Sequence, residues 1–424
     1  MKVLVVGSGG REHAIVWKLF QSPKIDKIYC APGNGGIGEY AECLPIGVLD
    51  TEEIIKVCRE KGIELVVVAP DDPLAKGMVN ELEQAGIRAF GPTREAALIE
   101  SSKSFSKNLM KKYNIPTAGF EVFDDMNRAL NYIKNHKYPL VVKADGLALG
   151  KGVIICENVD EAKDAILSIM EQKLFGEAGN TVVIEEFLTG PEISILTFTD
   201  GKTIVPMVSS QDHKRALDGD EGLNTGGMGA FSPSQHYTAN MAEFCMTKVF
   251  RPTIDAMNKE GRLFKGVLYF GLIITDEGPK VLEYNARFGD PETQVVLPRL
   301  NTDLLDIMDA VIDGQLDKTS IQWDEAACIC VIVASGGYPQ DYRKGLTISG
   351  LEEIRDNEDI LVFHAGTKKV GNGYFTNGGR VLGITAKGID LNAARDKVYK
   401  QIPTIHFEDA YYRSDIGKNF ISQD

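Results

Sequence analysis

Apolar residues in the first hundred positions occur in short continuous runs that are separated by longer segments with helical spacing. The runs fall at residues 2–7, 27–31, 64–69 and 88–91, and the helical segments at about 12–21, from 51 on, and at 74–85. Continuous apolar runs are typical of strands buried on both faces of a parallel sheet. Strands that alternate with helices in this way predict an open α/β sheet, and we take residues 1–102 as a first domain.

The pattern changes to paired strands beyond residue 102. Two apolar segments flank the glycine loop at 145–152, and strands at 265–276 and 279–285 flank a turn. Such pairs predict hairpins. We therefore expect a multidomain protein of the α/β and α+β classes. Its central region would be 103–325, divided into 116–190 and 191–325, followed by a mostly β C-terminal domain at 326–424.

The composition is that of a compact globular chain and limits the classes of partner. Hydrophobic residues make up 43% and charged residues 25% of the 424 positions, and the net charge is −14 with no run of Lys or Arg. This charge disfavours nucleic acid as a partner. No apolar stretch approaches the roughly 20 residues that span a bilayer, and the N-terminus does not resemble a secretory signal, so we expect no membrane association.

The cysteines indicate the compartment. There are seven, an odd and scattered set, which favours a reduced cytoplasmic setting. Cys328 and Cys330 lie in the run AACICVIVAS without a second Cys or His pair, so we expect buried core thiols and no zinc site. We expect a monomer, with a dimer as the alternative.

Glycine departs from the average and marks candidate binding sites. It makes up 43 of 424 residues, about a tenth of the chain against roughly 7% in an average protein. In the first cluster, Gly10 and Arg11 begin a helix directly after a strand, a junction that suits a phosphate. Glu12 stands where a G-x-G-x-x-G dinucleotide motif needs glycine, which disfavours a nicotinamide cofactor. The second cluster, PGNGG with Asn34 and Gly35, would lie at the same sheet edge, although both clusters also fit turns without a ligand.

The loop between Lys143 and Lys151 is the most informative glycine segment. Two cations flank a loop whose glycines are Gly146, Gly150 and Gly152. Backbone N–H groups and ammonium charges in such a loop match the oxygens of a polyphosphate. It is not a P-loop, because a glycine and a strand follow the lysine. The alternative is a hairpin turn with solvated lysines. Lys103, at the start of a helix, is a weaker candidate that a surface charge would also explain.

Carboxylates and amides gather at two further places. The segment EEFLTGPE ends one strand and begins the next, so that its backbone could pair with a ligand while Glu192 reaches a sugar hydroxyl; an exposed acidic turn would look similar. Glu283 and Asn285 alternate along a strand and share one face, where two hard oxygens suit Mg²⁺. A polar strand edge is the alternative. The octapeptide RFGDPETQ, which contains Arg287 and Asp290, follows directly.

The segment at 209–233 is long, polar and rich in glycine. A loop of this length is usually functional or disordered, and Met228 and Phe231 argue against plain disorder. We expect it to contact substrate. The six histidines, His213 among them, lack a partner at a recognisable spacing and are expected at the surface.

These motifs, taken in order, resemble the ATP-grasp carboxylate–amine ligases. The octapeptide RFGDPETQ, the segment DHKRALDGDEGLNTGGMGAFSP, the start GSGGREHA and the C-terminal ASGGYPQDYRKG, FHAGT and GGRVLGITA are similar to the phosphoribosylamine–glycine ligase family. That family implies the reaction of ATP, glycine and 5-phosphoribosylamine in purine synthesis, with Mg²⁺ or Mn²⁺, through a glycyl phosphate. One departure is Pro70-Asp71-Asp72-Pro73-Leu74, where the family more often has Gly-Pro-Glu-Ala-Pro-Leu.

The resemblance implies a role for each candidate residue. In the lid at 116–190 and its surroundings, ATP would be held by Lys103, Lys143, Gly146, Gly150, Lys151, Gly152, Glu185, Glu186, Phe187, Leu188 and Glu192. The metal would be held by Glu283 and Asn285, and the chemistry would be assisted by Arg287, Asp290 and Asp212. The remaining substrate contacts would come from Gly10, Arg11, Asn34, Gly35, Lys214, Asn224, Gly226 and Gly227.

Three other functions stay open from the residues alone. An ATP-grasp ligase with another acid or amine would share the glycine loop. A non-catalytic nucleotide sensor would bind nucleotide without releasing ADP, although an intact pair of Glu283 and Asn285 speaks against it. A nicotinamide oxidoreductase is disfavoured by Glu12.

Overall fold

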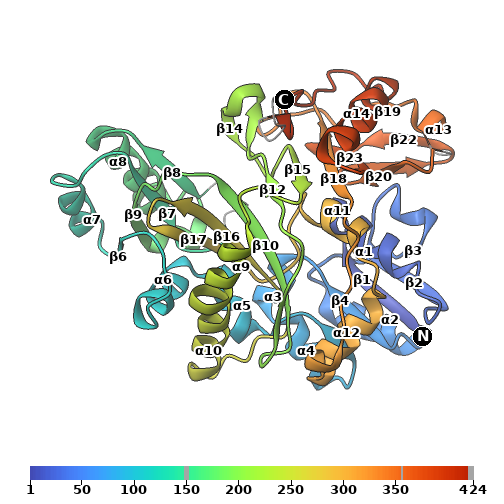
Figure 1. The fold of residues 1–424 in the computed structure, drawn as a ribbon, viewed down its shortest axis with the longest axis horizontal. Coiled ribbons are helices and arrows are strands. Elements are labelled where there is room, and N and C mark those ends of the chain that lie inside the picture. The colour runs from blue at the N-terminus through green and yellow to red at the C-terminus, as the bar shows by residue number, and fades with distance from the viewer. Residues whose placement is uncertain (148–151, 355–356, 419–424) are drawn as a thin grey trace.

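The computed structural model describes residues 1–147, 152–354 and 357–418. Two predicted nucleotide residues, Gly150 and Lys151, lie outside the described residues. In Figure 1 a lobe formed by residues 120–147 and 152–186 extends to the left, the N-terminal sheet lies at the lower right, and the C-terminal strands lie above that sheet. Long strands of the central region run between the lobe and the rest.

The N-terminal region is an open parallel sheet with helices on its faces. Its elements are β1 Lys2–Gly7, α1 Gly10–Leu19, β2 Lys27–Pro32, β3 Glu42–Cys43, α2 Thr51–Lys61, β4 Leu65–Val68, α3 Asp71–Lys76, α4 Met78–Gln84, β5 Arg88–Phe90 and α5 Arg94–Ser101. The strand order is β3-β2-β1-β4-β5, which confirms the predicted parallel sheet. Gly7 is in register with Pro32, and the N–H of Gly33 donates to the carbonyl of Gly7 at 3.0 Å. The two glycine turns therefore lie side by side at one sheet edge.

The helix predicted over 74–85 is two helices in the structure. Gly77 adopts a positive φ of 93°, a conformation that glycine allows and that ends α3 before α4 begins. The helical spacing of the apolar residues continues across the break, so the pattern alone did not show it.

The left-hand lobe is an antiparallel sheet covered by two helices. It contains β6 Phe120–Phe123, α7 Met126–Ile133, β7 Leu140–Ala144, β8 Val153–Cys156, α8 Val159–Ile166 and β9 Val182–Glu186, and it follows α6 Lys103–Lys112. The strand order is β6-β9-β7-β8, and the antiparallel pairing of β7 with β8 confirms the predicted hairpin. Leu140, Val142 and Ile184 of the sheet pack with Ala162 and Ile166 of α8 in a separate core.

The central region is built on a second antiparallel sheet. Its elements are β10 Glu192–Thr199, β11 Ile204–Pro206, α9 Ala239–Cys245, α10 Arg251–Lys259, β16 Gly266–Thr275, β17 Gly278–Asn285, α11 Thr293–Val296 and α12 Leu304–Asp313. The strand order is β11-β10-β16-β17.

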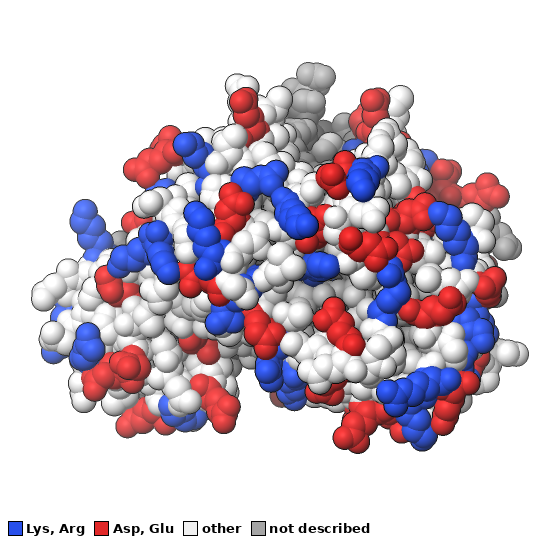
Figure 2. Space-filling model, turned by 90° about the horizontal axis from the view of Figure 1, so that it is seen from below, with Lys and Arg blue, Asp and Glu red and all other residues white. Residues whose placement is uncertain are grey.

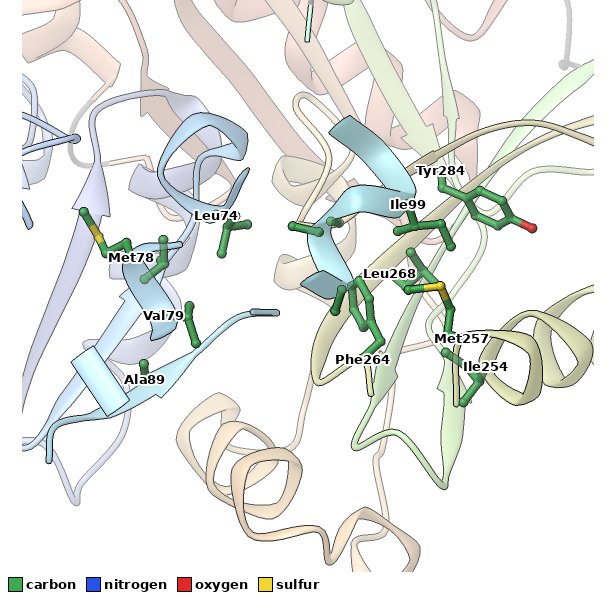
Figure 3. Close-up of a cluster of buried hydrophobic side chains, with 14 of the residues drawn as sticks. Leu74, Met78, Val79, Ala89, Ile99, Ile254, Met257, Phe264, Leu268 and Tyr284 are labelled. Carbon is green, nitrogen blue, oxygen red and sulfur yellow. The ribbon is translucent and has the colours of Figure 1, made fainter. Parts of the chain in front are cut away.

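One continuous hydrophobic core joins this sheet to the first hundred residues. Ile99 from α5 lies beside Leu268 of β16 and Tyr284 of β17, with Met257 and Ile254 of α10 on the far side (Figure 3). The same core extends to the strands of the N-terminal sheet. This shared core holds α5 against β17. It therefore also sets the positions of the polar residues that follow each of these two elements.

The C-terminal sheet takes strands from the segment predicted to be a long loop. The elements are β12 Gln211–Asp212, β13 Arg215–Leu217, β14 Glu221–Asn224, β15 Gly229–Ser232, β18 Ala327–Ala334, β19 Thr347–Ile348, α13 Leu351–Ile354, β20 Ile360–His364, β21 Thr367–Val370, β22 Gly373–Thr376, β23 Arg380–Gly388 and α14 Leu391–Gln401. The strand order β12-β15-β18-β23-β20 places the two ends of the 209–233 segment in one sheet with the C-terminal strands. The interruption by polar residues and glycines hid these short strands in the sequence.

The structure also tests the expectations for the cysteines, the histidines and the surface. Cys328 and Cys330 are fully buried in β18, as predicted. The expectation of surface histidines was wrong for His13, His213 and His364, which are buried. On the face shown in Figure 2, basic and acidic side chains are interspersed. No helix within the described residues is long and apolar enough to cross a membrane.

Candidate active site

Two lysines share one buried carboxylate between the lobe and α6. The Nζ of Lys143, on β7, lies 3.1 Å from the carboxylate of Glu185 on the neighbouring strand β9. The Nζ of Lys107, on α6, lies 2.8 Å from the same group, and both Lys107 and Glu185 are 2% exposed. Burial opposes ionisation of Glu185, but the two ammonium groups outweigh it and hold the pKa of this carboxyl below its ordinary value. The cluster therefore keeps a net positive charge, which suits a polyphosphate.

Lys103 ties the start of α6 to the glycine loop. Its Nζ donates to the carbonyl of Gly146 at 2.8 Å. Asp145 accepts from the backbone N–H of Ser104 at 3.0 Å and from the hydroxyl of Ser102 at 3.1 Å. Burial lowers the pKa of Lys103. The loop base and the helix start are thus held together, which brings a third ammonium group close to Lys143.

The proposed metal ligands lie at the end of β17. Glu283 and Asn285 are two positions apart on this strand, as predicted from the sequence. The carboxylate of Glu283 lies 3.6 Å from Nζ of Lys214, and the side-chain oxygen of Asn285 accepts from Arg287 at 3.1 Å. Burial opposes ionisation of Glu283, yet Lys214 and the other nearby cations hold its pKa below the ordinary value, so an ionised oxygen ligand is present.

This donor set fits a magnesium ion. Within the described part of the chain, no three His, Cys, Asp or Glu residues form a cluster that could hold a metal by themselves. Mg²⁺ takes one or two protein oxygens and completes its shell with phosphates and water. A carboxylate and an amide oxygen next to a phosphate-binding cluster meet that requirement.

Lys214 connects the nucleotide side of the site to the metal side. Its Nζ lies 3.2 Å from Glu192, the residue expected to reach a sugar, and 3.6 Å from Glu283. Burial would lower the pKa of Lys214, but Glu192, Glu283 and Asp212 raise it well above the ordinary value, so the lysine stays charged. Burial raises the pKa of Asp212 to about 7, and the nearby Glu292 adds to the effect. Asp212 is therefore a carboxyl that can exchange a proton near neutral pH.

Arg287 is held between the N-terminal region and β17. Its Nη2 lies 2.9 Å from Glu100, the residue after Ile99 on α5, and 3.8 Å from Asp71. Its Nε is buried and has no hydrogen-bond partner among the described residues. Burial raises the pKa of Glu100 in spite of this arginine. Asp71, which belongs to the segment that departs from the family pattern, contributes a second acid here.

Asp290 joins the RFGDPE turn to the first glycine cluster. Its Oδ2 accepts from the backbone N–H of Arg11 at 3.2 Å, and its Oδ1 accepts from the amide of Gln294 at 2.8 Å. The guanidinium of Arg11 contacts Glu12 at 2.7 Å and the carbonyl of Phe288 at 3.0 Å. The helix N-terminus of α1 and the RFGDPE turn therefore face one another.

The second glycine cluster is fixed from two sides. The side-chain amide of Asn34 donates to the carbonyls of Ser8 and His364, at 2.8 and 2.7 Å. The N–H of Gly35 donates to the carbonyl of Thr367 at 3.2 Å. The loop thus lies between the first glycine turn and the C-terminal sheet.

Other candidate residues lie at the end of β9 and on the connection from β9 to β10, in the β13–β14 hairpin and directly before β8. Glu186 is exposed and its carboxylate accepts from the N–H of Gly119 at 2.8 Å. Phe187 is 37% exposed, and Leu188 is half-buried on the same connection from β9 to β10. Asn224 is exposed and pairs with Arg215 in the β13–β14 hairpin. Gly152 accepts from the N–H of Ala144 at 2.9 Å.

Some residues of the site had no signal in the sequence. Lys107 looked like one more lysine of an amphipathic helix, and Glu100 like a helix-end acid. Glu292 is 4% exposed and accepts from Ser194 at 3.3 Å. Only the clustering of charges in RFGDPETQ pointed towards Glu292.

An antiparallel lobe with lysines at its inner edge, set against a sheet whose last strand carries an acid and an amide, defines an ATP-grasp protein. The fold agrees with the biotin carboxylase domain of Hydrogenobacter thermophilus 2-oxoglutarate carboxylase, with a TM-score of 0.74 at 18% identity over 97% of this chain and 91% of that one. Models of the phosphoribosylglycinamide synthetase N domain, ATP-grasp (A) domain and C domain match residues 1–100, 101–293 and 328–419. The chain belongs to the phosphoribosylglycinamide synthetase family.

Relatives agree along the full length. The phosphoribosylamine–glycine ligase of Caldanaerobacter subterraneus subsp. tengcongensis is 47% identical over 420 residues, covering 99% of this chain and 100% of that protein. The crystal structure of phosphoribosylamine–glycine ligase from Thermotoga maritima superposes with a TM-score of 0.87 at 33% identity, covering 98% of this chain and 100% of that one. The multidomain fold class predicted from the sequence is confirmed.

Proposed function

We propose that this chain is an ATP-dependent phosphoribosylamine–glycine ligase, which joins glycine to 5-phosphoribosylamine and releases ADP and phosphate. The observation that carries the proposal is the contact between Asp290 and the backbone N–H of Arg11. In this contact the turn that follows Glu283 and Asn285, the proposed metal ligands, lies against the helix N-terminus that suits a phosphate. Relatives with this name match the chain over its whole length.

The residues supply what acyl phosphate chemistry needs. A glycine carboxylate oxygen attacks the γ-phosphorus of ATP and ADP leaves; the amine nitrogen then attacks the acyl carbon and phosphate leaves. No protein nucleophile is required. Lys103, Lys143 and Lys107 spread the charge of the phosphates, and Glu283 and Asn285 would hold Mg²⁺, which supplies further charge neutralisation when bound. Asp212, with a pKa of about 7, is suited to accept the proton that the amine loses.

The remaining assignments are proposals of the same kind. Glu185, Glu186, Phe187 and Leu188 with Glu192 would hold adenosine, and Gly146, Gly150, Lys151 and Gly152 the phosphates. Arg287 would bind the glycine carboxylate, supported by its unpartnered Nε. Gly10, Arg11, Asn34 and Gly35 would hold the phosphoribosyl group, and Lys214, Asn224, Gly226 and Gly227 the reacting end of the substrates.

We also propose the wider setting of the enzyme. The domains would be 1–102, 103–325 and 326–424. The central domain would be divided into 116–190 and 191–325. The metal would be Mg²⁺, with Mn²⁺ as the alternative, since both accept oxygen ligands. A monomer in the cytoplasm is the working state that we propose, and seven free cysteines support the reduced compartment.

The test is a substrate comparison. Enzyme, ATP and Mg²⁺ are mixed with freshly made 5-phosphoribosylamine and either glycine or alanine, and ADP release is followed together with formation of the amide product. We expect turnover that requires the amine and strongly prefers glycine. Equal turnover with alanine would show another ligase, and nucleotide binding without ADP release under all mixtures would show a sensor.

A further inference from the structure

Arg380 contacts two of the proposed substrate loops at once. It is the first residue of β23, in the C-terminal sheet, and its side chain is 20% exposed. Its Nη1 lies 2.6 Å from the carbonyl of Gly226 and 3.3 Å from that of Gly227. The same nitrogen lies 2.8 Å from the carbonyl of Asp290 and 3.2 Å from its carboxylate. One guanidinium nitrogen therefore lies among four oxygens from two separate segments.

The Gly226–Gly227 segment and the Asp290 turn also pack closely against each other. A Cβ added to Gly227 would come within 2.5 Å of the ring of Pro291, the residue after Asp290. A Cβ on Gly226 would come within 3.1 Å of the Arg380 guanidinium. The N–H of Gly226 is bonded to the hydroxyl of Tyr338 at 3.0 Å, again from the C-terminal part of the chain. Arg380 therefore binds the carbonyls of a segment whose backbone packs directly against the Asp290 turn.

Through Asp290 the arginine acts on a third segment. The two carboxylate oxygens of Asp290 divide their partners: one faces Arg380 and Gln294, and the other accepts from the N–H of Arg11. A Cβ on Gly10 would come within 2.5 Å of the Gln294 amide, so this junction too is closely packed. Arg380 is thus linked to the turn that begins α1.

We infer that Arg380 is a positioning residue for the amine substrate, holding the Gly226–Gly227 segment, the Asp290 turn and the Arg11 turn in one arrangement. This inference rests on the proposed function. Lys143 and Glu185 lie in a different sheet and Lys107 lies on α6, and in the described structure none of them forms a hydrogen bond or ion pair with Arg380. Loss of the arginine therefore lowers kcat/KM for 5-phosphoribosylamine and leaves ATP affinity in place.

The experiment compares Arg380→Gln and Arg380→Lys with the wild-type enzyme. For each variant kcat/KM for 5-phosphoribosylamine is measured at saturating ATP and glycine, and the Kd of ATP is measured by calorimetry. Charge-assisted hydrogen bonds of this kind correspond to a loss of roughly ten- to a hundredfold. We expect that loss in kcat/KM in both variants, because a lysine side chain ends one atom short of the position of Nη1, and a change in ATP Kd of less than about twofold.

Arg395→Gln is the matched control. Arg395 also binds two backbone carbonyls of the C-terminal region, those of Ile416 and Ser414, at 3.2 and 2.6 Å, and contacts none of the proposed site residues in the described structure. It should leave kcat/KM for the amine unchanged. A third variant, Arg380→Ala, is assayed with added guanidinium ion, which should restore part of the lost activity if a guanidinium is what the loops require.

The outcomes are decisive in both directions. Unchanged kcat/KM in Arg380→Gln overturns the inference, and so does a loss of ATP affinity equal to the loss in kcat/KM, which would mark general unfolding. Failure of guanidinium to restore any activity to a folded Arg380→Ala enzyme also counts against it. If the wild-type enzyme itself shows no amine-dependent turnover, the proposed function has failed and not the role of Arg380.

Discussion

The ammonium of Lys214 lies 3.6 Å from the carboxylate of Glu283, the residue proposed to bind the metal. It also lies 3.2 Å from Glu192, so one positive charge is shared between two acids. A metal and a nucleotide sugar that use those acids must compete with this lysine. The ion pairs are partly exposed, so we treat their strength as modest.

Replacing Lys214 by Met should therefore make ADP binding depend more on metal. Without the ammonium, the two acids repel ADP when no metal is present and attract Mg²⁺ without a competitor. We expect the ratio of the ADP Kd in EDTA to that in Mg²⁺ to increase about fivefold, as removal of a partly exposed ion pair implies. Calorimetry gives both constants, with Lys202→Met as a surface control. An unchanged ratio would show that Lys214 does not compete with the metal.

Glu283→Gln should nearly abolish turnover. The substitution keeps the shape of the side chain and removes the charge that a divalent ion needs, so several kcal/mol of charge stabilisation are lost. We expect a fall in kcat of roughly a hundredfold or more and a higher Mg²⁺ concentration for half-maximal rate. Glu277→Gln, in the turn before the same strand, is the matched control, since Glu277 is 77% exposed and its ion pair in the described structure is with Lys280, away from the site. Wild-type Mg²⁺ dependence in the Glu283 variant would remove it from the metal site.

Arg287→Lys should be damaging although the charge is kept. One guanidinium nitrogen, Nη2, contacts both Glu100 and Asn285, and a lysine side chain ends one atom short of that position, so its ammonium cannot keep both contacts in the same geometry. Glu100 is buried and has a pKa raised by burial, so a weaker partner also costs about 1–3 kcal/mol of unfolding free energy. We expect a tenfold or larger fall in kcat/KM for glycine, roughly the worth of one charged hydrogen bond. Urea unfolding and glycine titrations measure the two effects separately.

Local patterns in the sequence predicted those parts of the site that lie on one element. Glu283 and Asn285 could be paired because a strand repeats every two residues, and Gly10 and Arg11 because a glycine turn followed an apolar run. The parallel sheet and the β7–β8 hairpin were found for the same reason.

Contacts between distant segments left no such pattern. Arg380 and Asp290 are 90 positions apart, and the pairing of β15 with β18 joins the segment that contains Gly226 and Gly227 to the C-terminal sheet. Lys107 follows Lys103 at the spacing of residues that share one face of a helix, so its position in the sequence does not set it apart. Its burial depends on Glu185 of β9. Tertiary packing decides the role of such residues.

The pH dependence of nucleotide binding should report Lys107. Burial lowers the pKa of this lysine to about 8, although Glu185 opposes the shift. Below that pH, the two ammonium groups of Lys107 and Lys143 and the carboxylate of Glu185 give the cluster a charge of +1. Above it, Lys107 has lost its proton, the charges of Lys143 and Glu185 cancel, and the charge of the cluster falls to zero. Affinity for the anionic nucleotide should therefore decrease as pH rises through about 8, by up to roughly tenfold, because one nearby charge is lost. ATP Kd values between pH 7 and 9.5 measure the change, and Lys107→Met should bind weakly with no step in this range. Lys111→Met, on the exposed side of the same helix, should keep the wild-type profile; a step that persists in Lys107→Met would assign it to another group.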